Sequence, residues 1–297
     1  MSAAARLPAS ARGALWMLAE AASMAIMIAA VRHLTREGMP SHEVAFFRGF
    51  FGLLLLGPWL FATLRTRPSL LWPPEWRLIL LRNVLSVSGM IAMFVGIGGL
   101  AISDVVAIQF THPLFVVIGA ALILRETVGP ARWSAVAAGF VGALIIIRPG
   151  FIDMNPLVFA VLFSALNNGG VQLITKHVSA GVPGSVLVFH MNLLLVPVAL
   201  ALAWDGWVWP PPHLLPWIVA VGLFGTLAHV FLARAFRAAD ASLVGPVDFM
   251  RLPIAALLGW VLFAETSDAA TWLGAAIIAI VVVAITRREA RRARDAV

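Results

Sequence analysis

The residues that could do chemistry in this chain are a few polar and ionisable side chains inside long apolar stretches. Asp248 and Arg251 lie three residues apart just before Pro253, and Glu20 interrupts an apolar stretch near the N-terminus. Charged groups in an apolar environment cost free energy, so they are candidates for function. The residues that we expect to bind a small polar ligand are Trp16, Glu20, Asn83, Gln109, His112, Asn167, Gln172, His229, Asp248 and Arg251.

Helix-breaking residues accompany the strongest of these candidates. The segments Gln109–Pro113 and Asp248–Pro253 each join polar side chains to a proline, and Asn167–Gly170 joins two amides to two glycines. A proline inside a helix removes one hydrogen bond and frees a carbonyl group. Together these groups could hold a zwitterion, with Asp248 or Glu20 binding an ammonium group while the amides and His112 bind a carboxylate.

Structural interpretations compete with these roles. Asp248 and Arg251 have the spacing of an ion pair on one helix, which would simply neutralise both charges. His112, His190 and His229 could be satisfied by packing or water, and Arg48 lies close enough to a helix end to reach the membrane interface. The three histidines have no local ligand spacing, so we expect no metal.

Catalytic motifs and cofactor sites are not evident. His42-Glu43 is followed at position 46 by Phe46 rather than the second histidine of a zinc protease motif. No Gly-x-Ser-x-Gly elbow is present, and no Gly-Lys pair for a phosphate-binding loop. We therefore expect no enzyme activity, no cofactor and no ATP hydrolysis. Energy would come from a gradient or from downhill movement of the solute.

Composition assigns the broad class. The chain has 297 residues, of which 61% are hydrophobic and 12% charged, and its mean hydropathy is +0.96. Soluble domains are roughly 45–50% apolar and about 25% charged, so this is a membrane protein. The net charge of +7 is scattered except for the terminal cluster Arg287–Arg294, which argues against nucleic-acid binding. Without cysteine, disulfides and cysteine-ligated metals are excluded.

Apolar segments long enough to cross a bilayer predict an all-α membrane protein with ten transmembrane helices. Continuous apolar runs, rather than alternation, exclude a β-barrel. The segments are approximately Gly13–Val31, Val44–Leu64, Leu78–Leu100, Val105–Leu124, Trp133–Ile147, Leu157–Ile174, Val186–Trp204, Leu214–Ala233, Leu243–Phe263 and Trp272–Ile285. Glu20 within the first segment argues against a cleavable signal peptide.

The basic residues predict the orientation. If the chain crosses the membrane ten times, the two termini lie on the same side. Sixteen of the 21 Lys and Arg residues, including Arg82, then lie at span ends on that side. Only Arg32, Arg36 and Arg148 fall at the opposite ends. Because positive charge favours the cytoplasmic side, both termini are predicted to be cytoplasmic.

An internal repeat divides the chain into residues 1–150 and 151–297. A shift of 139 positions superposes four pairs of residues: Pro58 and Pro197, Ser103 and Ser242, Glu126 and Glu265, and Trp133 and Trp272. A fifth pair, Pro113 and Pro253, misses this shift by one position. Five spans per copy reverse the entry side, which predicts two inverted five-helix repeats (5+5). Small residues spaced by four, at Ala135–Gly139 and Ala270–Gly274, predict close helix packing or a homodimer.

The segment Ala101–Gly150 resembles an EamA domain through Pro113, the run Leu124-Arg125-Glu126, Gly139 and Gly142, and the run Arg148-Pro149-Gly150. The second copy is similar, so the chain resembles the drug/metabolite transporter superfamily, nearest to bacterial amino-acid exporters of the YddG type. The resemblance implies an inverted-repeat carrier of the inner membrane. It also helps to assign the substrate site to spans 1, 3, 4, 6, 8 and 9.

These observations predict a secondary transporter in the bacterial inner membrane that exports a small metabolite, most plausibly an amino acid, by alternating access. The partners expected are the small-molecule substrate and the lipid bilayer. The alternatives are another solute class (a nucleoside, a vitamin or a drug-like cation), a channel, or an intramembrane enzyme. Proton coupling stays open, with Glu20 and Asp248 as the candidate carriers of the proton.

Overall fold

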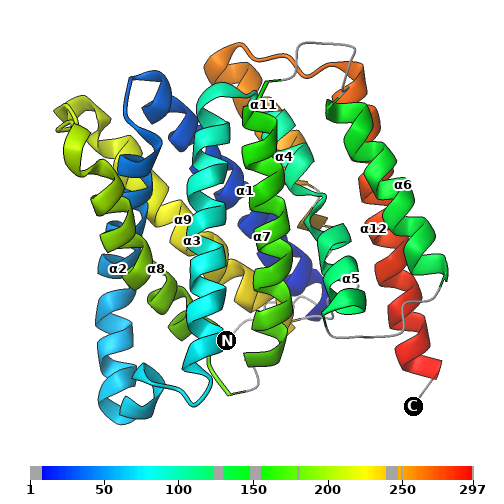
Figure 1. Ribbon diagram of the computed structural model, residues 1–297, viewed down its shortest axis with the longest axis horizontal. Helices are drawn as coiled ribbons and strands as arrows, with labels where there is room; N and C mark the ends of the chain where they lie inside the picture. The colour runs from blue at the N-terminus through cyan, green and yellow to red at the C-terminus, as the bar shows by residue number, and fades with distance from the viewer. Residues whose placement is uncertain are drawn as a thin grey trace, which may run out of the picture.

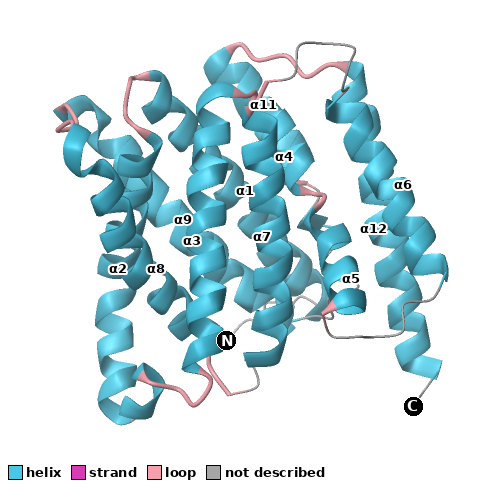
Figure 2. Cartoon of the chain, viewed as in Figure 1, coloured by secondary structure: helices cyan, strands magenta, loops and turns pink. Residues whose placement is uncertain are grey.

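The computed structural model describes residues 9–123, 130–147, 155–178, 181–238, 247–248 and 250–295, and every regular element within these ranges is helical (Figure 2). Short 3-10 turns lie at Pro68–Leu71, Trp204–Gly206 and Pro212–Leu214. The α-helices are α1 (Ala9–Arg36), α2 (Ser41–Thr66), α3 (Trp76–Gly99), α4 (Ile102–Gln109), α5 (His112–Leu122), α6 (Pro130–Ile147), α7 (Leu157–Val178), α8 (Gly184–Ala203), α9 (Leu215–Ala238), α11 (Arg251–Phe263) and α12 (Ala269–Asp295).

Six helical segments are long and apolar enough to cross a membrane: Ala11–Arg36, Trp76–Gly99, Ile102–Gly119, Leu157–Thr175, Gly184–Gly206 and Pro212–Ala235. Shorter apolar helices cover Val136–Ile146, Arg251–Phe263 and Ala269–Val281. Large apolar side chains such as Leu54, Phe61, Leu122 and Ile280 are exposed, as expected for surfaces that contact lipid. The all-α membrane class is thus confirmed, whereas the count of ten spans stays a prediction.

The break that Pro113 predicts lies between α4 and α5. Helix α4 ends at Gln109, the chain turns at Phe110 and Thr111, and α5 begins at His112 with the proline in its first turn. Proline has no N–H group to continue the ladder but fits the first turn of a new helix. In the second half, α11 likewise begins at Arg251, two residues before its proline. Both breaks place polar side chains beside a helix end.

The helices pack in reciprocal pairs. Helix α1 packs along α9 and α3 along α7, while α11 contacts α1 and α5 contacts α7; α2 pairs with α8 and α6 with α12 (Figure 1). If α7–α12 repeat α1–α6 in order, exchanging the halves converts the pair α1–α9 into α3–α7 and the pair α1–α11 into α5–α7, and it maps α2–α8 and α6–α12 onto themselves. Such exchange is the pattern expected of two repeats related by a twofold axis. Helix α1 begins and α12 ends at the same end of the bundle (Figure 1).

Backbone approaches backbone closely where α6 packs against α12. A Cβ atom added to Gly274 would lie 2.4 Å from the carbonyl oxygen of Gly142, so only glycine allows this approach. The small residues of the last span therefore serve packing within the chain, and the homodimer stays a prediction. The repeat positions Glu126 and Ser242 lie outside the described residues, as does the run Arg148-Pro149-Gly150.

Candidate functional site

The ionisable candidates form one cluster, which we call the Arg251 cluster: Glu20, Asp248 and Arg251. One terminal nitrogen of Arg251, at the start of α11, donates to both carboxylate oxygens of Glu20 at 3.0 and 3.1 Å and to Oδ1 of Asp248. Glu20 is 2% exposed in the middle of α1. The expected pair of Asp248 and Arg251 is present, and Glu20 joins it from 231 residues away. Both carboxylates bind Arg251, so an ammonium group at this cluster would share them with that guanidinium.

A second group of candidates is an amide network at the break between α4 and α5. The Nε2 of Gln109 donates to the hydroxyl oxygen of Ser164 on α7 at 2.7 Å. The Nδ2 of Asn168 donates to Oε1 of Gln109 at 3.1 Å, and Nδ1 of His112 lies 2.8 Å from the carbonyl oxygen of Gln109. The network offers neutral donors and acceptors in fixed positions, which suits an uncharged polar ligand.

The third group lies where α3 meets α7 and α8. Asn167 of α7 donates to the hydroxyl oxygen of Ser88 at 3.2 Å. Two turns earlier on α3, Arg82 donates to Oδ1 of Asn83 at 3.1 Å and to Oγ1 of Thr175 at 3.0 Å. It also donates to the carbonyl oxygen of Leu187 on α8 at 3.3 Å. All of these partners are uncharged.

Electrostatic interactions connect the groups. His112 interacts with Asp248 and Arg251, so the amide network borders the Arg251 cluster. His229 of α9 interacts with Arg48, Arg82 and Arg251, so it borders both the Arg251 cluster and the α3 group. We call the Arg251 cluster, the amide network and the α3 group, together with these two histidines, the polar region.

Two candidates lie differently from the rest. Trp16 stacks on Phe231 with ring centroids 5.4 Å apart, and the guanidinium of Arg234 lies 4.8 Å from the Trp16 ring. Trp16 therefore forms part of the α1–α9 packing. Gln172 is exposed on α7, and among the described residues it is the one member of the predicted set with an exposed side chain.

Sequence reasoning missed several buried polar residues. Arg82 was assigned to the cytoplasmic ends with the other basic residues, yet it is 7% exposed and lies within α3. Ser164 is 1% exposed, and Asn192, which lies in an apolar segment but is not in the predicted ligand set, is 0% exposed. The available signal was their position inside apolar segments, the same criterion that selected Gln109.

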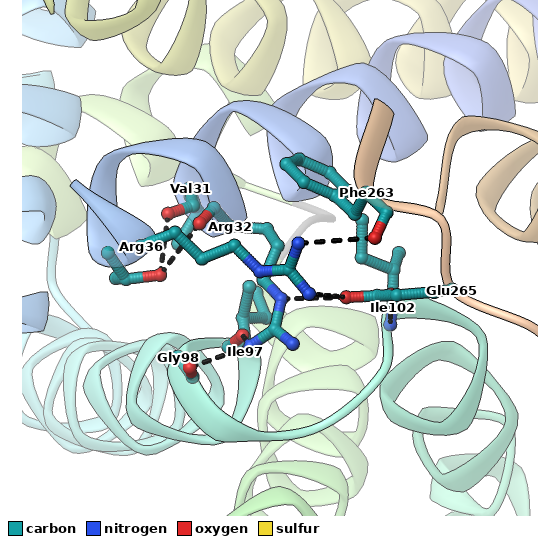
Figure 3. Close-up of polar contacts among 9 residues, drawn as sticks. Val31, Arg32, Arg36, Ile97, Gly98, Ile102, Phe263 and Glu265 are labelled. Atoms are coloured by element: carbon teal, nitrogen blue, oxygen red, sulfur yellow. Dashed lines mark hydrogen bonds and ion pairs between the residues drawn. The ribbon is translucent and has the colours of Figure 1, made fainter. Parts of the chain in front are cut away.

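A further ionic cluster, which we call the Glu265 cluster, joins Arg32, Arg36 and Glu265 at the end of the bundle where α1 finishes. Both guanidinium groups converge on one carboxylate (Figure 3), with nitrogen–oxygen distances of 2.9 Å from Arg32 and 3.0 Å from Arg36. Arg32 also donates to the carbonyl oxygens of Ile97 and Gly98 at 2.8 and 2.6 Å, at the end of α3.

The carboxylate and backbone complete this cluster. The other oxygen of Glu265 accepts the N–H of Ile102, the first residue of α4, at 2.9 Å. Arg36 donates to the carbonyl oxygen of Phe263 at 3.3 Å and lies over its ring. The cluster therefore ties the ends of α1, α3 and α11 and the start of α4 together (Figure 3).

The family follows from comparison with known proteins. The family model described as "EamA-like transporter family" matches this chain twice, at residues 11–148 and at residues 155–287. The chain belongs to the EamA-like transporter family. The expectation of a multi-pass secondary transporter is thereby confirmed.

Relatives along nearly the whole chain carry transporter names. A riboflavin transporter of Rhizobium johnstonii is 36% identical, covering 95% of this chain and 93% of its own. One of Vibrio cholerae is 34% identical, covering 95% of each. An S-adenosylmethionine uptake transporter of Rickettsia felis is 29% identical over 80% of each.

A solved crystal structure shares the fold, with a TM-score of 0.62 at 17% identity, covering 94% of this chain and 98% of the other. None of the three relatives is named as an amino-acid exporter. The comparisons therefore do not support the predicted export of amino acids.

Proposed function

We propose that this protein is a secondary carrier of riboflavin in the bacterial inner membrane. The observation that carries the proposal is the similarity to two proteins named riboflavin transporter, at 36% and 34% identity over almost the full length of each chain. Both EamA matches cover the helices that carry the polar region. At this identity we expect the relatives to build the corresponding region from the same helices.

The site's chemistry agrees with this substrate better than with an amino acid. The edge of the flavin ring system carries two carbonyl oxygens, ring nitrogens and one N–H, and it bears no charge at neutral pH. The amide network of Gln109, Asn168 and Ser164 offers matching neutral donors and acceptors. An amino acid would also place its ammonium group against a carboxylate, and both Glu20 and Asp248 bind Arg251, which an ammonium group would have to share them with.

The proposed mechanism is alternating access between two inverted halves of five spans each. The reciprocal helix pairs support it, since each half offers its third helix to the first helix of the other. In this arrangement the Glu265 cluster closes the end away from the termini, because it ties α1, α3 and α4 of the first half to α11 of the second. Substrate passage at that end requires the cluster to open.

Growth of a riboflavin-dependent bacterium tests the substrate directly. A strain that neither makes riboflavin nor carries its own riboflavin transporter should grow on low external riboflavin when it expresses this chain. Arg251→Gln, confirmed in the membrane fraction, should restore growth poorly. Equal growth with an empty vector, at a riboflavin concentration where a known riboflavin transporter supports growth, would contradict the proposal.

A further inference from the structure

Arg48 is buried with very little to bind. It lies in α2, is 2% exposed, and one of its terminal nitrogens donates to Oδ1 of Asn192 on α8. Among the described residues, its Nε and the Nδ2 of Asn192 are buried without any hydrogen-bond partner. Both unsatisfied atoms carry N–H groups, so the pair is a site that lacks acceptors.

Two glycines bring backbone close to these donors. A Cβ atom on Gly52 of α2 would lie 2.7 Å from Nδ2 of Asn192, and one on Gly225 of α9 would lie 3.3 Å from Nε of Arg48. Neither glycine brings a side chain that could accept a hydrogen bond. The hydroxyl oxygen of Thr226 on α9 lies 3.3 Å from the same Cβ position of Gly52, but neither unsatisfied donor bonds to it. The donors therefore lie at the junction of α2, α8 and α9, where the halves of the proposed carrier meet.

The charge of the surrounding region is positive. Arg48 and Arg82 bind only neutral groups among the described residues, and Arg251 binds two carboxylates. All three arginines act on His229. Three guanidinium groups against two carboxylates leave one net positive charge among these five groups.

A purely structural arginine would not be expected in such a position. A buried guanidinium without a carboxylate carries a large desolvation cost, and apolar residues of similar volume are often as good or better for stability. A cation that lies unpaired at membrane depth is therefore a candidate for ligand recognition.

We propose that Arg48 and Asn192 form a hydrogen-bond-donor subsite that binds acceptor oxygens of an uncharged or anionic heterocycle, and that the positive region disfavours cationic solutes. The inference rests on the proposed function, and for riboflavin the acceptors are the ring carbonyl oxygens. Arginine suits this role because its planar fork can meet paired acceptors. In the conformation described here the subsite is closed by the contact of α2 with α8 and α9.

Asn192→Asp separates recognition from structure, because it supplies the missing carboxylate to Arg48. If Arg48 is structural, the new ion pair keeps or raises thermal stability and leaves riboflavin transport unchanged. If Arg48 binds the ligand, the protein stays folded, but the carboxylate occupies the donors. The KM for riboflavin counterflow in proteoliposomes should then rise about tenfold or more.

Two further variants and one analogue complete the test. Arg48→Gln should raise the KM similarly, Arg48→Lys less, and Arg77→Gln on the exposed start of α3 should leave it unchanged. A riboflavin analogue with a ring carbonyl oxygen replaced by sulfur, a weaker acceptor, should bind worse than riboflavin to the natural protein. That difference should disappear in Arg48→Gln. An unchanged KM in Asn192→Asp, or an unchanged analogue difference in Arg48→Gln, would overturn the subsite.

Failure of the proposed function gives a different result. If the natural protein carries no riboflavin, its thermal stability is measured with flavin mononucleotide, lumichrome and S-adenosylmethionine. Stabilisation by an anionic or uncharged ligand that Arg48→Gln abolishes would support the subsite with a different substrate. Stabilisation by the cationic ligand alone, or by none of them, would overturn it.

Discussion

The two ionic clusters of this carrier use the same groups in opposite proportions. The Arg251 cluster has two carboxylates on one guanidinium, whereas the Glu265 cluster has two guanidinium groups on one carboxylate. If all groups are ionised, the first carries one excess negative charge and the second one excess positive charge.

Helix ends account for part of each imbalance. In the Glu265 cluster Arg32 bonds to the carbonyl oxygens of Ile97 and Gly98, at the negative end of α3. In the Arg251 cluster Asp248 lies just before the first turn of α11, at its positive end.

Depth separates the two clusters. The side chain of Arg36 is 41% exposed, so water reaches the Glu265 cluster, whereas the Glu20 side chain is 3% exposed. Among the described residues, no buried side-chain nitrogen or oxygen of the Glu265 cluster lacks a hydrogen-bond partner, whereas the buried Nε of Arg251 does. In the proposed mechanism, the Glu265 cluster holds one end of the bundle closed, and the Arg251 cluster supplies an unbalanced charge to the transport path.

The largest expected effect is that of removing the single cation. Arg251→Gln leaves the buried Glu20 and the half-buried Asp248 without a positive partner, and breaking the buried pair with Glu20 costs about 3–5 kcal/mol. Thermal unfolding in detergent should show a strongly destabilised protein. Adding Glu20→Gln and Asp248→Asn should recover most of the stability, and failure to recover it would show that charge balance is not what Arg251 supplies.

The next effect tests whether the Glu265 cluster closes its end. Glu265→Gln removes the ion pairs with Arg32 and Arg36. A hydrogen bond between charged groups contributes at most about 1.5–3 kcal/mol, and the pair with Arg36 contributes less because Arg36 is exposed. The chain has no cysteine, so Leu100→Cys at the end of α3 provides a single label. A membrane-impermeant maleimide should label the cysteine of Leu100→Cys several-fold faster in the Glu265→Gln background than in the natural one.

The matched control for this experiment is Glu37→Gln, which removes an exposed acid at the same end of α1. It should leave the labelling rate unchanged. Equal rates in the natural, Glu265→Gln and Glu37→Gln backgrounds would mean that the Glu265 cluster does not gate access.

A smaller effect is expected from removing one of the two carboxylates. Asp248→Asn leaves Glu20 paired one-to-one with Arg251, so stability should fall by no more than about 1–2 kcal/mol. Riboflavin flux should nevertheless decrease several-fold if the excess negative charge takes part in transport. Flux equal to that of the natural protein, measured with and without a proton gradient, would assign the carboxylate to packing and remove it from proton coupling.

The smallest effect should be at Gln172. Its side chain is exposed on α7, unlike that of Gln109, which bonds to Ser164. Gln172→Ala should change the KM for riboflavin less than twofold, whereas Gln109→Ala should raise it at least several-fold. A larger effect at Gln172 would show that substrate meets the exposed face of α7.

Local patterns in the sequence predicted the features that depend on neighbours in the chain. Apolar runs predicted the helices, Pro113 predicted the break before α5, and the three-residue spacing predicted the pair of Asp248 and Arg251. The all-α membrane class depends on such local signals alone.

Contacts between distant segments could not be predicted in this way. Glu20 meets Arg251 across 231 residues, and Arg32 meets Glu265 across 233. Counting charges used Arg82 only to predict the orientation, because nothing near it in sequence indicates the hydroxyl of Thr175 and the carbonyl of Leu187 that bind it. Such partners depend on which helices pack together.

Riboflavin counterflow in proteoliposomes tests the central claim most directly. Vesicles with the purified protein are loaded with unlabelled riboflavin, and entry of labelled riboflavin is followed beside vesicles loaded and tested with amino acids. The account predicts saturable exchange of riboflavin, weakened in Arg251→Gln, and no exchange of amino acids. Amino-acid exchange without riboflavin exchange, by protein shown to be folded, would contradict it.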